Sequence, residues 1–221
     1  MNRTTAIIVA AGEGQRFGAP KQFVHLKGIP VLDWCLESFD SHVKIREIVL
    51  VLVSEVQKKD YMEKYKKISH VIAGGRFRQD SVLAGFNTID PAQTDLVLVH
   101  DGVRPLVGHD LISRVLQAAK ESGAAVPVIP VEDTLKRIKG ENVLETLDRD
   151  QIVRVQTPQG FVYQVLKTAL ERARDEAHYG TDEAALVERL GGRVTLVQGD
   201  SRNIKITTPD DLKIAEALCE D

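Results

Sequence analysis

The stretch TAIIVAAGEGQRFGAPKQ, residues 5–22, joins an apolar run to a long loop that carries three glycines, a proline and two cations. The run from Thr5 to Ala10 is almost continuously apolar, which is typical of a strand buried on both faces in a parallel sheet. Glycines let the backbone approach an anion closely, and the N–H groups of such a turn bind its oxygens. The stretch therefore predicts the first strand of an α/β sheet followed by a phosphate-binding loop.

Two common phosphate-binding loops do not fit this spacing. The dinucleotide fingerprint G-x-G-x-x-G leads straight into a helix, but Phe17 stands at its third glycine position and Pro20 resists a helix there. The ATPase loop needs a Gly-Lys pair, which this segment lacks. What remains is a loop with Arg16 and Lys21, and such cations suit a triphosphate and a leaving pyrophosphate. The loop favours nucleotidyl transfer, and a plain surface turn is the alternative.

Apolar runs and amphipathic stretches alternate through the rest of the chain. We expect strands at residues 5–10, 48–53, 96–100, 124–130, 194–198 and 204–207, and helices at residues 31–39, 55–66, 78–87, 110–121, 162–176, 182–190 and 209–219. This order predicts an α/β fold with a single doubly wound, mostly parallel, Rossmann-like sheet. No repeat or linker interrupts it, so we expect one domain over residues 1–221.

The alternation breaks between residues 131 and 154, where VEDTLKRIKGENVLETLDRDQIVR is polar, charged and weakly alternating. A turn at residues 140–142 predicts a β-hairpin that protrudes from the main sheet. An isolated two-stranded hairpin is marginally stable in water. We therefore expect this arm to pack against a second copy of the chain and to make a homodimer.

Composition indicates an ordinary globular protein. The 221 residues carry 29 Lys and Arg against 32 Asp and Glu, so no overall basic charge points to a nucleic-acid partner. The two cysteines form neither a disulfide framework nor a metal-binding spacing. No run approaches the roughly 20 apolar residues that span a bilayer, and no secretory signal opens the chain. We expect a cytoplasmic protein with no nucleic-acid partner and no membrane association.

The segment HDGVRP, residues 100–105, follows a strand-like apolar run. In open α/β sheets ligands bind beyond the carboxyl ends of the strands, which places Asp101 at the site. A carboxylate beside bound phosphates is a candidate ligand for Mg²⁺, which uses one or two carboxylates together with phosphate oxygens. The alternative is an ion pair between Asp101 and Arg104 that braces the strand end. We expect His100 to be structural.

Two other segments carry candidate site residues. The Gly74-Gly75 turn precedes a helix that Asp80 or Ser81 would cap, and for Asp80 we favour this structural role. Lys205 lies between two isoleucines, so alternation along a strand sends its side chain to the opposite face from both. An exposed edge lysine is the usual interpretation of such a position.

The loop resembles the signature of the sugar-nucleotidyltransferase superfamily, and seven segments behind it resemble one family in order. They are GGRFRQDSVLAG (74–85), HDGVRP (100–105), PVEDTLKR (130–137), TLDR (146–149), QTPQGF (156–161), GTDEA (180–184) and NIKITTPDDL (203–212). Over essentially the whole chain they are similar to the 2-C-methyl-D-erythritol 4-phosphate cytidylyltransferases. Two positions depart from that family's pattern, since Val103 replaces the usual alanine and Arg76 stands where an acidic residue is frequent.

The resemblance implies an Mg²⁺-dependent transfer of the cytidylyl group from CTP to 2-C-methyl-D-erythritol 4-phosphate, with release of pyrophosphate, in non-mevalonate isoprenoid precursor biosynthesis. Ribitol-5-phosphate cytidylyltransferase shares several of these segments and is the enzyme alternative. The segments TLDR and PVEDTLKR favour the erythritol enzyme. A CTP-binding homologue without turnover is the other alternative, and the joint presence of Arg16, Lys21, Asp101 and Lys205 argues against it.

The resemblance also assigns roles to individual residues. Those with catalytic roles are Arg16, Lys21 and Lys205. The nucleotide would be bound by Ala10, Ala11, Gly12, Gly14, Gly75 and Ser81. The acceptor polyol phosphate would be bound by Asp101, Arg104, Thr134, Arg149, Thr157 and Thr181. Thr134 and Arg149 would reach from the arm into the partner subunit's site, and Asp101 would also be the metal ligand.

Overall fold

The computed structural model describes residues 3–14, 17–56 and 58–219. Its strands are β1 (Thr4–Ala10), β2 (His25–Leu26), β3 (Ile29–Pro30), β4 (Glu47–Leu52), β5 (Ile68–Ala73), β6 (Leu96–Asp101), β7 (Ala124–Pro130), β8 (Lys136–Lys139), β9 (Asn142–Thr146), β10 (Val153–Val155), β11 (Gln159–Val162) and β12 (Thr195–Gln198). Its α-helices are α1 (Val31–Ser41), α2 (Lys58–Lys64), α3 (Arg78–Phe86), α4 (His109–Ser122), α5 (Tyr163–Asp175), α6 (Glu183–Arg189) and α7 (Pro209–Leu218). Short 3-10 turns lie at Lys21–Phe23, Pro91–Gln93 and Arg149–Gln151.

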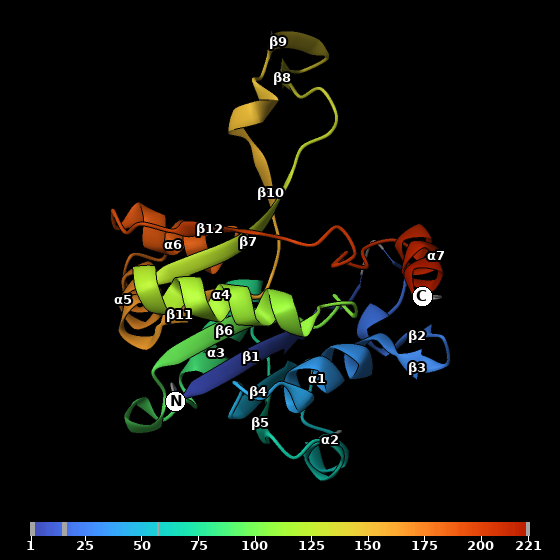
Figure 1. Ribbon diagram of the computed structural model, residues 1–221, viewed down its shortest axis with the longest axis vertical. Coiled ribbons are helices and arrows are strands. Elements are labelled where there is room, and N and C mark those ends of the chain that lie inside the picture. The colour runs from blue at the N-terminus through green and yellow to red at the C-terminus, as the bar shows by residue number, and fades with distance from the viewer. Residues whose placement is uncertain (1–2, 15–16, 57, 220–221) are drawn as a thin grey trace.

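Within the described residues the central sheet has eight strands, in the order β10-β7-β11-β6-β1-β4-β5, with β12 paired to β7 (Figure 1). The pairs β1–β4, β1–β6, β4–β5 and β7–β12 are parallel. Of these eight strands, only β10 and β11 run against their neighbours. The prediction of a mostly parallel α/β sheet is confirmed, and the antiparallel strand β11 between β6 and β7 is a feature that the sequence pattern did not indicate.

Helices cover both faces of the sheet because successive side chains of a buried strand point to opposite sides. Ile8 belongs to the apolar cluster under α1, α2 and α4, whereas Ile7 packs with α3, α5 and α6. Both residues are fully buried. This two-sided burial explains the nearly continuous apolar runs of the strands. Of the helices in the described part of the chain, α4 is the longest with 14 residues, and none is long and apolar enough to cross a membrane.

The predicted arm is present as a hairpin that projects from the central sheet (Figure 1). Strands β8 and β9 pair only with each other, in an antiparallel ladder. Ile138, Val143 and Leu144 on this hairpin are each more than half exposed. The predicted boundary at residue 154 was wrong by two residues, because Val153 and Arg154 belong to β10 and pair with β7 in the central sheet.

The segment at residues 204–207 was expected to be a strand, and that prediction was wrong. It has no regular secondary structure. The N–H of Ile206 donates to the carbonyl of Val103 at 2.9 Å, and its side chain is buried in the apolar cluster that includes Ala215 of α7. Anchoring of Ile206 on that side leaves Lys205 facing the other way, so the predicted alternation holds without a strand.

Candidate active site

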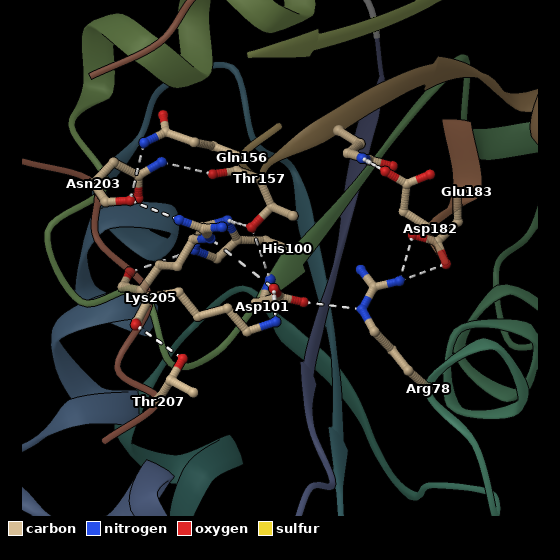
Figure 2. A network of polar contacts seen from close by, with 12 residues as sticks. Arg78, His100, Asp101, Gln156, Thr157, Asp182, Glu183, Asn203, Lys205 and Thr207 are labelled. Atoms are coloured by element: carbon tan, nitrogen blue, oxygen red, sulfur yellow. Dashed lines mark hydrogen bonds and ion pairs between the residues drawn. The ribbon is translucent and has the colours of Figure 1, made fainter. Parts of the chain in front are cut away.

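Asp101, the last residue of β6, lies at the centre of a group of charged side chains (Figure 2). Lys205 Nζ lies 2.7 Å from Oδ2 of Asp101, and Arg78 Nε lies 3.0 Å from Oδ1. Arg104 Nε is 4.0 Å from Oδ2. Asp101 is 6% exposed, so three cations from distant parts of the chain converge on a nearly buried group.

The charge of Asp101 is held in place by these cations. Burial by itself would raise the pKa of the carboxyl, but the positive charges of Arg78, Lys205 and Arg104 outweigh it and hold this pKa well below its usual range. Asp101 is therefore ionised throughout the neutral range. Burial favours loss of the proton from Arg78, and its two carboxylate neighbours, Glu183 and Asp101, outweigh that effect and raise the pKa of Arg78.

A cavity of about 500 Å³, which we name the loop cavity, opens on one side of Asp101. It is lined by Val9, Ala10, Ala11, Gly12, Glu13, Lys21, Gln22, Gly75, Arg76, Phe77, Arg78, Ser81, Asp101, Val103 and Lys205. Most residues with a predicted nucleotide role are in this lining. The strand end of β1, the glycine loop and the turn before α3 thus form one hollow at the carboxyl edge of the sheet.

A smaller cavity of about 160 Å³, the inner cavity, also borders Asp101. It is lined by Arg78, Asp101, Arg104, Val155, Gln156, Thr157, Gln159, Thr181, Asp182 and Lys205. The two cavities share Arg78, Asp101 and Lys205. Four residues with a predicted acceptor role, namely Asp101, Arg104, Thr157 and Thr181, are therefore brought together beside the loop cavity.

The glycine turn before α3 is shaped for close approach to a ligand. The N–H of Gly75 donates to Ser81 Oγ at 3.1 Å, and the carboxylate of Asp80 accepts from the N–H of Phe77 at 3.0 Å. Asp80 thus caps α3, as predicted. A Cβ on Gly74 would lie 2.4 Å from the Cβ of Ala11, and one on Gly75 would lie 2.3 Å from the Cβ of Asp80. Only glycine therefore fits at these two positions, and Gly75 itself lines the loop cavity.

Gly14 shapes the loop, whereas Lys21 reaches the loop cavity. Gly14 has a φ of +71°, and its carbonyl accepts the N–H groups of Phe17 and Gly18 at 2.8 and 2.9 Å. A Cβ there would lie 1.9 Å from the carbonyl oxygen of Ala19. Gly14 is outside the cavity lining and shapes the turn of the loop. Lys21 lines the loop cavity, and Arg16 lies outside the described residues.

The polypeptide around Thr157 positions the end of β6. Thr157 Oγ1 accepts the N–H of Asp101 at 3.1 Å and lies 3.0 Å from Nδ1 of His100. Burial lowers the pKa of His100 to about 3, so its ring is neutral and serves to hold Thr157 rather than to carry charge. This agrees with the expected structural role. Arg104 donates from Nη1 to the carbonyl of Asn203 at 2.7 Å, which fixes it beside the inner cavity.

Two predicted acceptor residues are not brought to this group. Thr134 and Arg149 are exposed on the arm and line neither cavity. Arg149 Nη1 donates to the carbonyl of Glu132, within the base of the arm. Within the described chain neither residue contributes to the group around Asp101.

Arg78 and Glu183 were not among the predicted site residues. Arg78 Nη1 lies 2.8 and 2.9 Å from the two carboxylate oxygens of Glu183, whose exposure is 1% (Figure 2). The segments GGRFRQDS and GTDEA that contain them were both recognised. Nothing in either segment indicates that side chains 105 positions apart form a buried pair.

Asp101 fits a divalent cation that brings most of its own ligands. Among the described residues no group of three or more His, Cys, Asp or Glu side chains forms a metal cluster. Each oxygen of Asp101 is in one close ion pair with a cation, and a carboxylate offers about four lone-pair positions. The donor set thus suits a hard ion such as Mg²⁺ that is held by one carboxylate and by oxygens of a bound ligand.

The chain is similar to known proteins over nearly all of its length. The model of the family IspD, 2-C-methyl-D-erythritol 4-phosphate cytidylyltransferase, matches residues 4–221. The enzyme of that name from Bacillus velezensis is 44% identical over 220 residues, which cover 96% of this chain and 94% of the relative. The one from Syntrophus aciditrophicus is 43% identical over 98% of this chain and 95% of the relative.

Solved structures agree with the sequence comparison. The crystal structure of 2-C-methyl-D-erythritol 4-phosphate cytidylyltransferase from Thermus thermophilus has a TM-score of 0.83 and 38% identity, and covers 100% of both chains. The structure of 4-diphosphocytidyl-2C-methyl-D-erythritol synthase from Anaerococcus prevotii has a TM-score of 0.88 and 32% identity, and covers 100% of this chain and 97% of that one. The glycine loop, the Asp101 group and these matches lead to one conclusion: the chain belongs to the 2-C-methyl-D-erythritol 4-phosphate cytidylyltransferase family and is a nucleotidyltransferase.

Proposed function

We propose that the chain binds CTP in the loop cavity and 2-C-methyl-D-erythritol 4-phosphate in the inner cavity, and transfers the cytidylyl group between them at Asp101. An oxygen of the acceptor phosphate forms a bond to the α-phosphorus of CTP, and the bond from that phosphorus to the β-phosphate oxygen breaks. The products are 4-diphosphocytidyl-2-C-methyl-D-erythritol and pyrophosphate. This reaction is an intermediate step of isoprenoid precursor biosynthesis. The observation that carries the proposal is that both cavities share Arg78, Asp101 and Lys205.

The nucleotide is bound mainly by main-chain groups. Ala10, Ala11, Gly12 and Gly14 form the loop that surrounds the triphosphate, and Gly75 and Ser81 read the cytosine. Gly75 lines the loop cavity, and a Cβ on Gly75 would lie 2.3 Å from the Cβ of Asp80, so a bare backbone is available there for close contact with the base. Arg76 also lines this cavity, and its guanidinium lies 5.1 Å from the centre of the Phe77 ring, a cation–π contact.

Charge stabilisation is the source of catalysis. A phosphate monoester is anionic near neutral pH, so the acceptor needs no general base. Arg16 and Lys21 bind the triphosphate and the leaving pyrophosphate, and Lys205 stabilises the reacting phosphates from the opposite side. Orientation by a fixed set of cations in a partly enclosed cavity is the usual means of accelerating phosphoryl-type transfers.

The acceptor is held by hydroxyl and cationic groups. Asp101, Thr157 and Thr181 bind the polyol hydroxyls, and Arg104 lies beside them in the lining of the inner cavity. Mg²⁺ is the cation that we propose for Asp101, with the remaining ligands from CTP. When bound it neutralises negative charge on the phosphates.

We propose a homodimer of single-domain subunits in which the arm, residues 131–152, completes the partner's site. Thr134 and Arg149 then bind the acceptor phosphate across the interface, where the planar guanidinium donates two hydrogen bonds. Support comes from the exposed apolar side chains of the hairpin, which a second copy would cover. The two cysteines are free thiols, which supports a location in the reducing cytoplasm.

The test is CTP-dependent pyrophosphate release with each polyol phosphate in turn. The proposal predicts rapid release with 2-C-methyl-D-erythritol 4-phosphate and little with ribitol 5-phosphate. Robust release with ribitol 5-phosphate and none with the erythritol substrate would overturn the acceptor assignment. Tight CTP binding without release from either acceptor would instead identify a homologue that has lost turnover.

A further inference from the structure

Arg78 joins two carboxylates that belong to different parts of the site. Its Nε donates to Oδ1 of Asp101 at 3.0 Å, and its Nη1 donates to both oxygens of Glu183 (Figure 2). Arg78 lines both cavities, whereas Glu183 lines neither. Glu183 therefore does not contact a molecule bound in either cavity, and it affects the site through Arg78.

Glu183 and Asp101 fix the guanidinium from two directions. A planar guanidinium offers donors in a rigid fork, so contacts to two carboxylates leave it little freedom to rotate. Asp101 in turn receives Arg78 on one oxygen and Lys205 on the other, which fixes the plane of its carboxylate. Without the contact to Arg78, the Asp101 carboxylate would be held through Lys205 on only one oxygen and would be free to turn.

The two elements that carry this pair are also joined by neighbouring contacts. Gln79 donates to the carbonyl of His178 at 2.9 Å and accepts the N–H of Gly180 at 2.9 Å. The hydroxyl of Tyr179 donates to Asp80 at 3.0 Å. Loss of the Arg78–Glu183 contact would therefore leave α3 attached to the segment before α6, and would change mainly the orientation of side chains at Asp101.

We propose that Arg78, held by Glu183, is a positioning residue that sets the orientation of Asp101 toward the acceptor in the inner cavity. This inference rests on the proposed function, because it assigns the acceptor to that cavity. It predicts that the pair matters for the acceptor far more than for CTP. The nucleotide is bound by the glycine loop and the Gly75–Ser81 turn, which keep their other contacts.

The variants are Glu183→Gln, which keeps the shape and removes the charge, and Arg78→Lys, which keeps the charge and removes the fork. A lysine ammonium in place of the guanidinium has one charged nitrogen and contacts one carboxylate well at a time. We expect kcat/KM for 2-C-methyl-D-erythritol 4-phosphate to fall about 100-fold in Glu183→Gln, as a small misplacement of a reacting group produces. KM for CTP should change far less, because the glycine loop and the Gly75–Ser81 turn make most of the nucleotide contacts and Asp101 adds one ligand to the Mg²⁺ that CTP also binds.

The matched control is Glu176→Gln, which removes a carboxylate from the exposed ion pair with Arg189 between α5 and α6, outside both cavities. It should leave both kinetic constants unchanged. Thermal unfolding of all variants shows whether each one folds. If Glu183→Gln does not fold, Arg78→Lys provides the test, again by comparison of the kinetic constants for the acceptor with those for CTP.

Three results decide the inference. An acceptor-specific loss in either folded variant supports it. Native acceptor kinetics in both variants would overturn it, and so would an equal loss for both substrates that follows the loss of thermal stability. A crystal structure of Glu183→Gln adds a readout that needs no turnover, because the Asp101 carboxylate should be rotated from its native plane. If the native enzyme turns over neither acceptor, the proposed function is contradicted instead. The orientation of Asp101 in the crystal structure of Glu183→Gln, compared with the native structure, then decides the positioning role.

Discussion

Lys205 Nζ lies 2.7 Å from Oδ2 of Asp101, although 104 positions separate the two residues in the chain. The contact exists because Ile206 is bonded to the carbonyl of Val103 and buried on the opposite side. The C-terminal segment thereby delivers a cation to the end of β6, where the loop cavity and the inner cavity meet. The packing of the C-terminal segment thus determines where Lys205 lies in the proposed site of transfer.

Replacement of Lys205 by alanine should reduce turnover without unfolding the protein. We expect kcat to fall about 100-fold or more, since removal of one group that stabilises developing charge has an effect of that size. Asp101 keeps its ion pair with Arg78, and Lys205 is itself more than one-third exposed, so the native structure should persist. Pyrophosphate release and circular dichroism measure the two effects. Lys213→Ala, which removes an exposed lysine paired with Asp210 on α7, is the matched control. Turnover of Lys205→Ala at the level of this control would contradict the catalytic role.

Replacement of Lys21 by alanine tests the other side of the charge arrangement. Lys21 lines the loop cavity, where the proposed triphosphate and leaving pyrophosphate lie. We expect kcat to fall about 100- to 1,000-fold, because the positive charge stabilises the transition state more than the bound substrate. Steady-state rates with saturating CTP measure this effect. Lys58→Ala on the exposed surface of α2 provides the control. A near-normal rate in Lys21→Ala would refute the charge stabilisation that we assign to this loop.

The arm can be tested by mixing two inactive variants. Arg149→Ala lacks the proposed contact from the arm to the acceptor phosphate in the partner's site. Lys205→Ala lacks the cation that the subunit contributes to its own site. In a mixed dimer, one site receives Lys205 from one subunit and Arg149 from the other. Random mixing of a symmetric dimer should restore about one quarter of native activity.

The control for this experiment is a mixture of Arg149→Ala with a variant that carries both substitutions. No mixed dimer then contains an intact site, and activity should remain low. Recovery only in the first mixture supports a site shared between subunits. Low activity in both mixtures, measured after exchange of subunits is verified by mass, would place Arg149 outside the partner's site.

The sequence indicated the elements of the fold better than their partners in space. Continuous apolar runs such as Leu96–Val99 predicted buried strands correctly, because burial on both faces leaves a strong local pattern. The run at residues 204–207 alternates apolar and polar residues, which is also typical of a strand, but it is not one. The N–H of Ile206 donates to the carbonyl of Val103 in a loop, and no strand of the described chain pairs with this segment. Hydrogen-bond partners of that kind depend on the whole fold.

The site shows the same division. The family resemblance assigned Asp101, Thr157 and Thr181 to the acceptor, and of these only Asp101 was also placed by its position after a predicted strand. All three line the inner cavity. The Arg78–Glu183 pair was not predicted, since it depends on how the first residue of α3 faces the first residue of α6. Ion pairs between helix ends have no periodic pattern in the sequence.

His42 should make the stability of the fold depend on pH near neutrality. Its Nδ1 accepts the N–H of Lys44 at 3.2 Å, its Nε2 lies 3.0 Å from Ser113 Oγ, and His109 packs against its ring. Burial, followed by the charge of His109, lowers the pKa of His42 in the native state. Below about pH 6.5 the histidine therefore binds a proton in the unfolded chain but not in the native state. The free energy of unfolding consequently falls as the pH falls below about 6.5.

The measurement is urea unfolding between about pH 7.5 and about pH 5.5, a range that brackets the ordinary histidine pKa. His42→Gln should show a shallower fall in the free energy of unfolding than the native protein, with a difference of at most about 1.4 kcal/mol per pH unit. His42 lines neither cavity, so activity at the upper end of this range should be unchanged. Parallel pH profiles for the two proteins would show that His42 does not control this dependence.

The most direct test of the two-cavity account is a crystal structure with a non-reactive CTP analogue and 2-C-methyl-D-erythritol 4-phosphate bound together. We predict the triphosphate beside Lys21 and the cytosine at the Gly75–Ser81 turn. The acceptor should lie between Thr157 and Thr181, with its phosphate directed toward the α-phosphorus at Lys205. Binding of both molecules in the loop cavity, or of the acceptor outside the inner cavity, would contradict the account.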